Sequence, residues 1–395
     1  MSPWWAQLPV RSPVTASMLG AALRGVVGGG GGRARVEAEL AERFGADWAV
    51  LTASGTAALA VALRSVLGGV AGGRVALPAY CCYDVATAAV GAAAHILTYD
   101  LDPATLSPDL DSVRRALDAG AQAVVVAHLY GYPADVPAVR LLAREHGVEL
   151  IEDAAQGAGA TLGGVRVGSL ANLSVLSFGR GKGITTGGGG ALLGKGAMPE
   201  LVETELGPPR HGLSNVVVLA ALATFGWPGV FGVVRAAPRL GVGETTYRHP
   251  TPSRLGSGVC AAVLPAARAV AATELNRRRE NAAAYIREIG QVARVRTIHP
   301  LADADPGFLR FPVVWTGLTM RDLTGARALG VMAGYPRALV DVPEIGDKVV
   351  NSTEKVPGAR LLAERLMTLP THGGMSPRDV ADVCAWLRLA GGVTG

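Results

Sequence analysis

The sequence predicts an α/β protein with a mostly parallel β-sheet flanked by helices, followed by a smaller α+β C-terminal domain. In the first half of the chain, short apolar segments alternate with segments of helical spacing, as in sheets buried on both faces. Polar residues follow directly after several apolar segments, where ligands bind in such sheets. Because the pattern changes past residue 247, we expect a large domain of residues 1–247 and a small domain of residues 248–395.

The helices and strands of the large domain are predicted from the spacing of apolar residues and from the positions of glycine and proline. Residues 35–44 and 137–146 have helical spacing, and Pro137 suits the start of its helix. The glycine run of residues 28–32 reads as a loop. The short apolar segments predicted as strands are 48–51, 75–77, 123–127, 148–151, 174–178 and 190–193.

The small domain combines a long helix with one clear strand. Residues 258–285 read as the helix, and residues 310–315 as the strand. Two shorter helices, 358–367 and 377–389, follow.

Residues 216–234 carry no charged side chain and are numerous enough for a membrane span. Gly226 and Pro228 interrupt them, which favours a two-helix insertion at about residues 213–240. Such an insertion would pack on the core, on a dimer partner or on an apolar substrate. Weak membrane contact through residues 216–234 is the alternative.

Composition narrows the class of protein. Hydrophobic residues make up 49% of the chain and charged residues 17%, as in a folded globular protein. The net charge of +5 is spread without a basic block, so we expect no nucleic-acid partner. No cysteine or histidine spacing indicates a metal site, and the absence of a signal-peptide pattern suggests a cytoplasmic protein.

Lys182 and Asp153 carry the main chemical signal. Asp153 ends an apolar strand, and Lys182 lies in a later glycine-rich loop. A lysine amine can form a Schiff base with the aldehyde of pyridoxal 5′-phosphate (PLP). A carboxylate can keep the pyridine nitrogen protonated, so that the ring acts as an electron sink. The pair therefore suits PLP.

Two further segments suit the same cofactor. Ser54, Gly55 and Thr56 follow a strand and open a helix, an arrangement that can bind phosphate, although Ser and Thr also cap many helices. Tyr83, after Cys81 and Cys82, is a candidate for stacking on the pyridine ring. Core packing beside a strand would explain Tyr83, or Tyr80, equally well.

The chain from about residue 37 to residue 193 resembles the DegT/DnrJ/EryC1/StrS family of PLP-dependent sugar aminotransferases. Weaker similarity continues to Asp379, so the resemblance covers most of the chain. The residues that carry it are Ser54-Gly55-Thr56-Ala57-Ala58-Leu59, Ala127-His128-Leu129-Tyr130-Gly131 with Asp135, residues 146–156 through Asp153 and Gln156, Gly163, Val167-Gly168-Ser169, Ser177-Phe178 and Lys182.

This resemblance implies the type I fold of PLP-dependent transferases and a homodimer with active sites at the subunit interface. It implies that Lys182 is the Schiff-base lysine and proton shuttle, that Asp153 pairs with the ring nitrogen and that Gln156 bonds the ring hydroxyl. The phosphate would lie on the remaining matched residues, Gly55, Thr56 and Ser177.

Several positions depart from the family pattern and suggest a divergent branch. Gly183 stands where an Asn commonly follows the lysine, and a common Glu is replaced near Gly188. The family's Asn-x-Arg, whose Asn reaches the partner subunit's phosphate, reads Pro252-Ser253-Arg254. Cys82 occupies the usual aromatic position.

The predicted activity moves an amino group from glutamate or glutamine to a keto group on a sugar, nucleotide-sugar or cyclitol-like acceptor, in secondary-metabolite or glycan biosynthesis. One alternative is another PLP reaction on the same fold: decarboxylation, elimination or C–C bond formation. A second is a non-catalytic PLP-binding regulator. The candidate substrate contacts, each equally open to a structural role, are His128, Tyr130, Arg180, His211 and Arg254.

Overall fold

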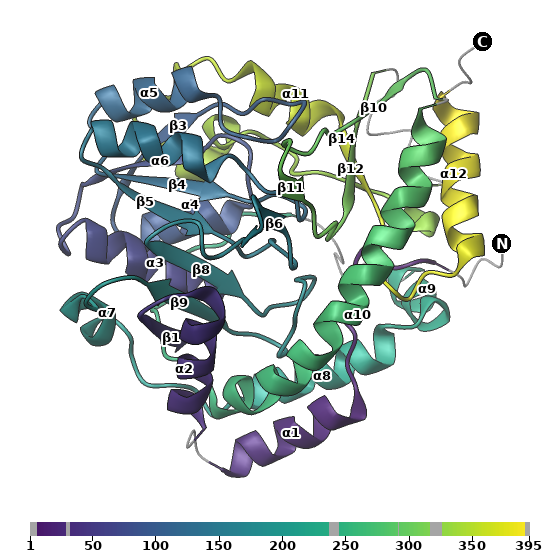
Figure 1. The fold of residues 1–395 in the computed structure, drawn as a ribbon, viewed down its shortest axis with the longest axis horizontal. Helices are drawn as coiled ribbons and strands as arrows, with labels where there is room; N and C mark the ends of the chain where they lie inside the picture. Colours follow the sequence, from purple (N-terminus) through teal and green to yellow (C-terminus); the bar gives the residue numbers. More distant parts are fainter. Residues whose placement is uncertain (1–5, 29–31, 237–244, 291, 317–325, 392–395) are drawn as a thin grey trace.

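A seven-stranded sheet forms the centre of the larger body of the protein (Figure 1). The computed structural model describes residues 6–28, 32–236, 245–290, 292–316 and 326–391. In spatial order the strands are β1 (Trp48–Thr52), β9 (Gly190–Gly194), β8 (Leu173–Ser177), β5 (Glu149–Asp153), β4 (Ala123–Ala127), β2 (Arg74–Pro78) and β3 (His95–Tyr99).

The sheet is mostly parallel, as predicted. Strand β9 pairs antiparallel with both of its neighbours, β1 and β8, and the pairings from β8 through to β3 are parallel. Every predicted strand of this region is present within one or two residues. The edge strand β3 was not predicted from the sequence.

Helices cover both faces of this sheet, which explains the continuous apolar strands. Alternate residues of a strand point to opposite faces, so in β4 Val125 packs with helices α3 (Gly55–Val66) and α4 (Tyr83–Gly91). Val124 packs on the other face, with α2 (Arg33–Phe44), α5 (Leu110–Asp118) and α6 (Val136–Glu145). The short helix α7 (Glu200–Thr204) contacts α3.

The C-terminal part forms a second sheet, which is antiparallel. Its order is β10 (Val295–Thr297), β12 (Phe311–Trp315), β14 (Leu366–Leu369) and β13 (Met332–Ala333). Helices α11 (Pro357–Arg365) and α12 (Pro377–Gly391) accompany it. The helix predicted over 358–367 is too long, because Leu366 and Met367 pair with β12 and belong to β14. Tertiary pairing has overridden the helical spacing there.

A small third sheet joins distant parts of the chain. It has the order β11 (Ala304–Asp305), β6 (Thr161–Leu162) and β7 (Val165–Arg166). Its β11–β6 pairing holds the C-terminal part against the loop that follows Gln156. The domain division at residue 247 remains a prediction.

Helix α10 (Gly258–Ile289) links the two larger sheets and is the long helix predicted from the sequence. Length and composition alone would allow it to cross a membrane, a test that core helices also pass. Here it packs along α1 (Ala16–Val27), α2 and α12, and its Leu264 and Tyr285 are fully buried. We therefore assign α10 to the protein core.

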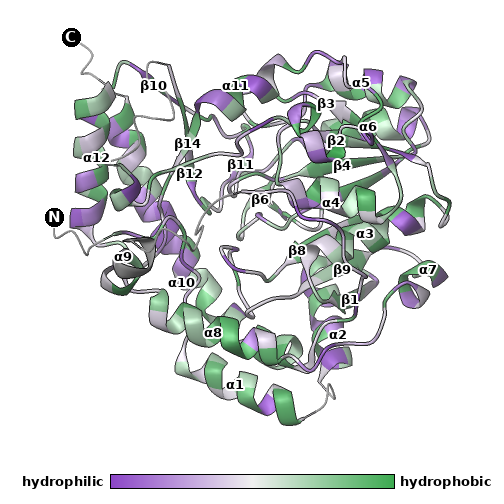
Figure 2. Cartoon of the chain, turned by 180° about the vertical axis from the view of Figure 1, so that it is seen from behind, coloured by the Kyte–Doolittle hydropathy of each residue, from purple (hydrophilic) through white to green (hydrophobic). Residues whose placement is uncertain are grey.

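The apolar insertion forms two helices, as predicted: α8 (Leu213–Phe225) and α9 (Pro228–Ala236). Leu219 is the buried residue of α8 and packs with Met18 of α1 and Val259 of α10. Figure 2 shows that most of α8 consists of hydrophobic residues. Residues 237–240 of the predicted insertion, and 29–31 of the predicted glycine loop, lie outside the described residues.

Candidate active site

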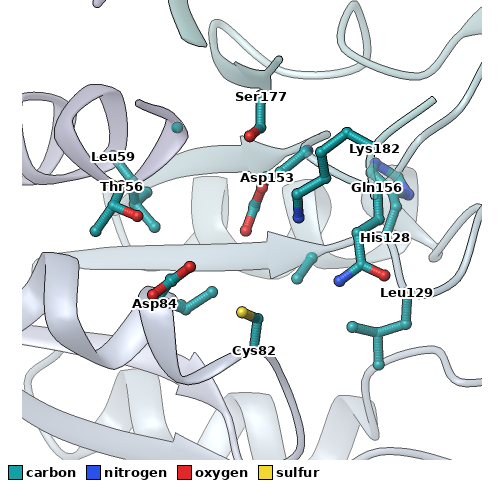
Figure 3. A pocket seen from close by; sticks show the side chains of 14 residues that line it. Thr56, Leu59, Cys82, Asp84, His128, Leu129, Asp153, Gln156, Ser177 and Lys182 are labelled. Atoms are coloured by element: carbon teal, nitrogen blue, oxygen red, sulfur yellow. Dashed lines mark hydrogen bonds between the residues drawn. The ribbon is translucent and has the colours of Figure 1, made fainter. Parts of the chain in front are cut away.

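A pocket opens at the carboxyl ends of the parallel strands (Figure 3). It holds about 480 Å³ of atom-free space, part of it open to solvent. The lining residues come from separate loops that the sheet brings together: Gly55, Thr56, Leu59, Cys82, Asp84, Val85, Ala127, His128, Leu129, Asp153, Ala155, Gln156, Ser177 and Lys182.

Asp153 and Lys182 face the same cavity (Figure 3). Asp153 ends β5; its Oδ1 accepts a hydrogen bond of 2.9 Å from Ala155 N, and its Oδ2 has no protein donor within the described chain. Burial raises the pKa of the Asp153 carboxyl, while the Ala155 hydrogen bond and the nearby Lys182 charge oppose that shift. Asp153 therefore presents a carboxylate oxygen that a cationic partner would stabilise.

The Lys182 loop is held from two sides. Ser12 Oγ, from the N-terminal segment, donates to Lys182 O at 2.8 Å. On the other side, a Cβ on Gly183 would lie 2.7 Å from Ala158 Cα. The backbone after Lys182 therefore passes too close to Ala158 for any larger residue, which gives a physical reason for glycine at this position.

The start of α3 forms the opposite end of the pocket. Ser54 caps the helix, because its Oγ accepts from Ala57 N at 3.0 Å. A Cβ on Gly55 would lie 2.9 Å from Ser177 Cβ, so the helix terminus is pressed against Ser177. Helix N–H groups and two hydroxyls, of Thr56 and Ser177, thus converge where an anion would be favoured.

Gln156 is held in a fixed orientation at the edge of the pocket. Its Oε1 accepts from Tyr130 N at 3.1 Å, and its Nε2 donates to Tyr335 Oη at 2.6 Å. Tyr130 has a φ of 56°, in the left-handed region that a bulky residue adopts only under strain. The Gln156 contact is one of the interactions that hold this turn.

His128 forms a buried pair with Glu152. Ala134 N donates to His128 Nδ1 at 2.9 Å, so the ring carries its proton on Nε2, which donates to Glu152 Oε1 at 3.0 Å. Burial opposes ionisation of Glu152, but the His128 hydrogen bond and backbone donors outweigh it, and the pKa of Glu152 lies below its ordinary value. A neutral imidazole is thereby fixed in the pocket wall.

Comparison with known proteins identifies the family. The model of the DegT/DnrJ/EryC1/StrS aminotransferase family matches residues 17–216 and 249–388. The chain belongs to this family. The unmatched residues 217–248 contain most of α8 and all of α9, so the apolar insertion is a departure from the DegT/DnrJ/EryC1/StrS pattern.

Relatives in the DegT/DnrJ/EryC1/StrS family are named for sugar and cyclitol substrates. A dTDP-4-dehydro-2,3,6-trideoxy-D-glucose 4-aminotransferase of Saccharopolyspora spinosa is 30% identical, over 88% of this chain and 86% of its own. An L-glutamine:2-deoxy-scyllo-inosose aminotransferase of Streptoalloteichus tenebrarius is 40% identical over 38% of this chain and 37% of its own.

Solved structures agree with the predicted fold class. DesV of S. venezuelae is 25% identical and has a TM-score of 0.76, covering 96% of this chain and 95% of its own. The aminotransferase TlmJ of Streptoalloteichus hindustanus is 27% identical and has a TM-score of 0.75, covering 97% of this chain and 98% of its own. The fold is that of the DegT/DnrJ/EryC1/StrS aminotransferases, and this chain is an aminotransferase.

The structure does not bring Tyr83 to the pocket, although it was a predicted cofactor contact. Its side chain is buried, and its hydroxyl donates to Arg337 O at 3.3 Å. Tyr80 is also buried, and its hydroxyl pairs with that of Tyr130 at 3.1 Å. Cys82 lines the pocket instead, at the position where the DegT/DnrJ/EryC1/StrS family usually has an aromatic residue.

One of the five predicted substrate contacts lines the pocket, and the other four do not. His128 lines the pocket. Tyr130 is buried behind the pocket, and Arg180 and His211 are exposed outside its lining. Arg254 O accepts from Ala53 N beside the start of α3, but the Arg254 guanidinium is directed to Pro208 O.

Sequence reasoning missed several residues of this region. Asp84, in the first turn of α4, adds a carboxylate to the pocket (Figure 3). Its position in the first turn of the helix that follows β2 was a usable signal. Glu152 was passed over beside Asp153, and Tyr335 lies far along the chain with no motif around it. Only the packing of the two sheets reveals Tyr335.

Proposed function

We propose that this aminotransferase uses PLP to move an amino group from glutamate or glutamine to a keto group on a sugar, nucleotide-sugar or cyclitol-like acceptor. The observation that carries the proposal is one pocket that holds Lys182, Asp153 and the N-terminus of α3. The names of the relatives from Saccharopolyspora spinosa and Streptoalloteichus tenebrarius support the acceptor class.

The residues present fit PLP at both of its ends. Asp153 Oδ2, which has no donor in the described chain, suits a protonated pyridine nitrogen. Burial disfavours the ionised form of Asp153, and the positive charge of that nitrogen would favour it. The close approach of Gly55 to Ser177 leaves backbone N–H groups and a hydroxyl for a phosphate. Lys182 Nζ projects toward Asp153 (Figure 3).

When bound, PLP supplies an electron sink that makes the α-proton of an amino acid removable. Lys182 Nζ would hold and move that proton, as general acid–base. Asp153 would pair with the ring nitrogen and keep it protonated, and Gln156 would hydrogen-bond the ring hydroxyl. The fixed neutral imidazole of His128 closes one wall of the pocket and adds no charge there.

The decisive experiment replaces Lys182 with Ala and follows the absorbance of the PLP-loaded protein after L-glutamate or L-glutamine is added. We expect the unmodified protein to change its spectrum and Lys182→Ala to show no turnover. Lys195→Ala is the matched control, because Lys195 is exposed and its Nζ has one weak hydrogen bond among the described residues, to Ser169 O at 3.5 Å.

A chemical readout tests the same assignment without turnover. Borohydride reduction of the loaded protein should fix the cofactor on the peptide that contains Lys182, as seen by mass spectrometry. Normal transamination by Lys182→Ala, or a label elsewhere, would show that the assignment is wrong. An unchanged spectrum with both donors would refute glutamate and glutamine as donors.

The homodimer that the resemblance implies and the location expected from the sequence remain predictions. We expect a homodimer, a cytoplasmic location and no nucleic-acid or metal requirement. Weak membrane contact through residues 216–234 remains the alternative for the apolar insertion.

A further inference from the structure

A second cavity lies at β10, the edge strand of the C-terminal sheet. It holds about 1440 Å³ of atom-free space, part of it open to solvent. Its lining comes from the loop after β3, the end of α10, the chain around β10, the end of β12 and α11. Figure 1 shows β10 between α11 and the C-terminal end of α10. Among the described residues, this lining shares no member with the pocket that contains Lys182.

Much of the lining of this second cavity is apolar. The apolar side chains are those of Ile286, Ile289, Val292, Val295, Val314 and Leu361. Ile289 and Val292 are buried, whereas Ile286 is 53% exposed and Leu361 is 37% exposed. The apolar wall therefore reaches from the protein interior to the solvent. A ligand that covers its exposed part would remove apolar surface from water, which favours binding.

The same lining contains two arginines and an imidazole, those of Arg296, Arg365 and His299. No Asp or Glu of the described chain lines the second cavity. Arg365 Nη2 pairs with Glu364 at 3.0 Å, whereas Arg296 belongs to none of the ion pairs among the described residues. A cleft lined by one sign of charge attracts ions of the other sign.

The carboxylates nearest in sequence to the lining residues are already engaged. Asp102 closes its own turn, because its Oδ1 accepts from Ala104 N and its Oδ2 from Thr105 Oγ1, both at 2.9 Å. Glu288, near the end of α10, pairs with Arg388. The positive charge of Arg296 therefore remains for a ligand to balance.

Each arginine of the second cavity stands beside an apolar side chain. Arg296 of β10 is directly opposite Val314 of β12 in the antiparallel register, so their side chains are neighbours on one face of the sheet. Leu361 and Arg365 are four residues apart in α11 and lie on one face of that helix. The cavity thus offers a cation next to an apolar surface at two places.

We propose that the second cavity binds a small amphipathic anion, with an aromatic or aliphatic body and a carboxylate, sulfonate or phosphate at one end. The body covers the apolar wall, and the charged end pairs with Arg296 and Arg365, whose guanidinium groups match such oxyanions in shape and charge. Because the lining is separate from that of the pocket with Lys182, this ligand binds together with the substrates of amino transfer and not in their place.

The first test uses two dyes with the same aromatic body. Anilinonaphthalene sulfonate carries an anionic group, and N-phenylnaphthylamine lacks it. Fluorescence titration should show that Arg296→Gln combined with Arg365→Gln weakens sulfonate binding by about tenfold or more, as for the loss of a hydrogen bond to a charged group. The affinity for the neutral dye should not change. Arg287→Gln combined with Arg294→Gln is the matched control, because both arginines are exposed nearby and neither lines the cavity.

The second test fills the cavity. Leu361→Trp places an indole in it from α11, and Ala104→Trp does so from the loop after β3. Both variants should weaken the binding of both dyes, and thermal unfolding shows that each is folded. The exposed apolar side chains of α8 can also bind dye, so the titrations are repeated with Val217→Asp in every protein; Val217 is 67% exposed and does not line the cavity.

Equal sulfonate affinity in the double arginine variant and its control would overturn the proposal. Dye binding that survives both tryptophan variants would be adventitious and would also overturn it. So would displacement of the sulfonate dye from the PLP-loaded protein by L-glutamate or L-glutamine, because the dye would then occupy the pocket with Lys182. If instead neither dye bound and both tryptophan variants lowered the mass in light scattering, the occupant would be a second copy of the chain and the proposal would be wrong.

Discussion

Glu152 and Asp153 are adjacent in β5 and have opposite roles. Successive residues of a strand point to opposite faces, so Asp153 faces the pocket and Glu152 faces the loop after β7. Glu152 accepts hydrogen bonds from His128, Ser174 and the backbone N–H groups of residues 168, 170 and 171. One buried carboxylate thus orients the wall of the active site.

Glu152→Gln should destabilise the protein, because an amide NH₂ would meet donors where only an acceptor fits. We expect the free energy of unfolding in urea to fall by about 3–5 kcal/mol, the range for breaking a buried charged network. Glu149→Gln in the same strand is the control, since Glu149 accepts a single long hydrogen bond of 3.4 Å from Asn172. Equal losses in the two variants would contradict this account.

His372 couples stability to pH. It is buried, its Nε2 contacts Leu8 O at 2.9 Å, and burial lowers its pKa from 6.5 to about 4. The unfolded chain therefore binds more protons than the folded protein between these values, so the free energy of unfolding should decrease as the pH falls from 6.5 to 4. Urea titrations at several pH values should show a shallower decrease for His372→Gln.

At the scale of elements, the crossing of α1 and α10 depends on a single glycine. A Cβ on Gly25 would lie 2.7 Å from Val259 Cα, whereas one on Gly20, in the same helix, would meet only Arg24 Nη1 at 3.6 Å. The backbones of the two helices therefore touch at Gly25 and not at Gly20.

Gly25→Ala should lower the free energy of unfolding by roughly 1–3 kcal/mol through overpacking. Gly20→Ala should be neutral or stabilising by up to about 1 kcal/mol, because alanine is the better helix former. Thermal unfolding of the two variants separates these effects. Equal changes in the free energy of unfolding for the two variants would show that helix propensity alone sets their stability and that the close approach at Gly25 has no effect.

At the scale of the whole molecule, the insertion leaves an apolar surface uncovered. We call the side chains of Leu213, Val217, Phe225 and Trp227 the α8–α9 surface; they are 61%, 67%, 43% and 62% exposed. Clustered exposed apolar residues usually mark an interaction site. Because Val217, Phe225 and Trp227 lie outside the family match, the partner of this surface can differ from those of related enzymes.

We expect light scattering to give twice the chain mass of 40.4 kDa for the unmodified protein. Val217→Asp should shift the protein toward monomer, because a carboxylate buried without a partner at the interface would oppose association. Liposome flotation tests the alternative, which is weak membrane contact through residues 216–234. A dimer that survives Val217→Asp would place the dimer interface elsewhere. Flotation that this substitution abolishes would assign the α8–α9 surface to membrane contact.

The sequence by itself determined the parallel sheet and many of the positions that line the pocket. Local patterns decide both, since runs such as residues 123–127 can be buried only between two helical layers. Lys182, Asp153, Gln156, Gly55, Thr56 and Ser177 follow strand ends or open a helix, and parallel strands bring such positions to one edge.

Only the tertiary structure decided which side chains complete the pocket. Tyr83 and Cys82 are neighbours in sequence, and the orientation at the start of α4 turned Cys82 inward and buried Tyr83. Tyr335 contacts Gln156 at the pocket edge through the packing of a second sheet on the first. Contacts between residues so far apart depend on how whole layers pack, and no local pattern of apolar and polar residues encodes that packing.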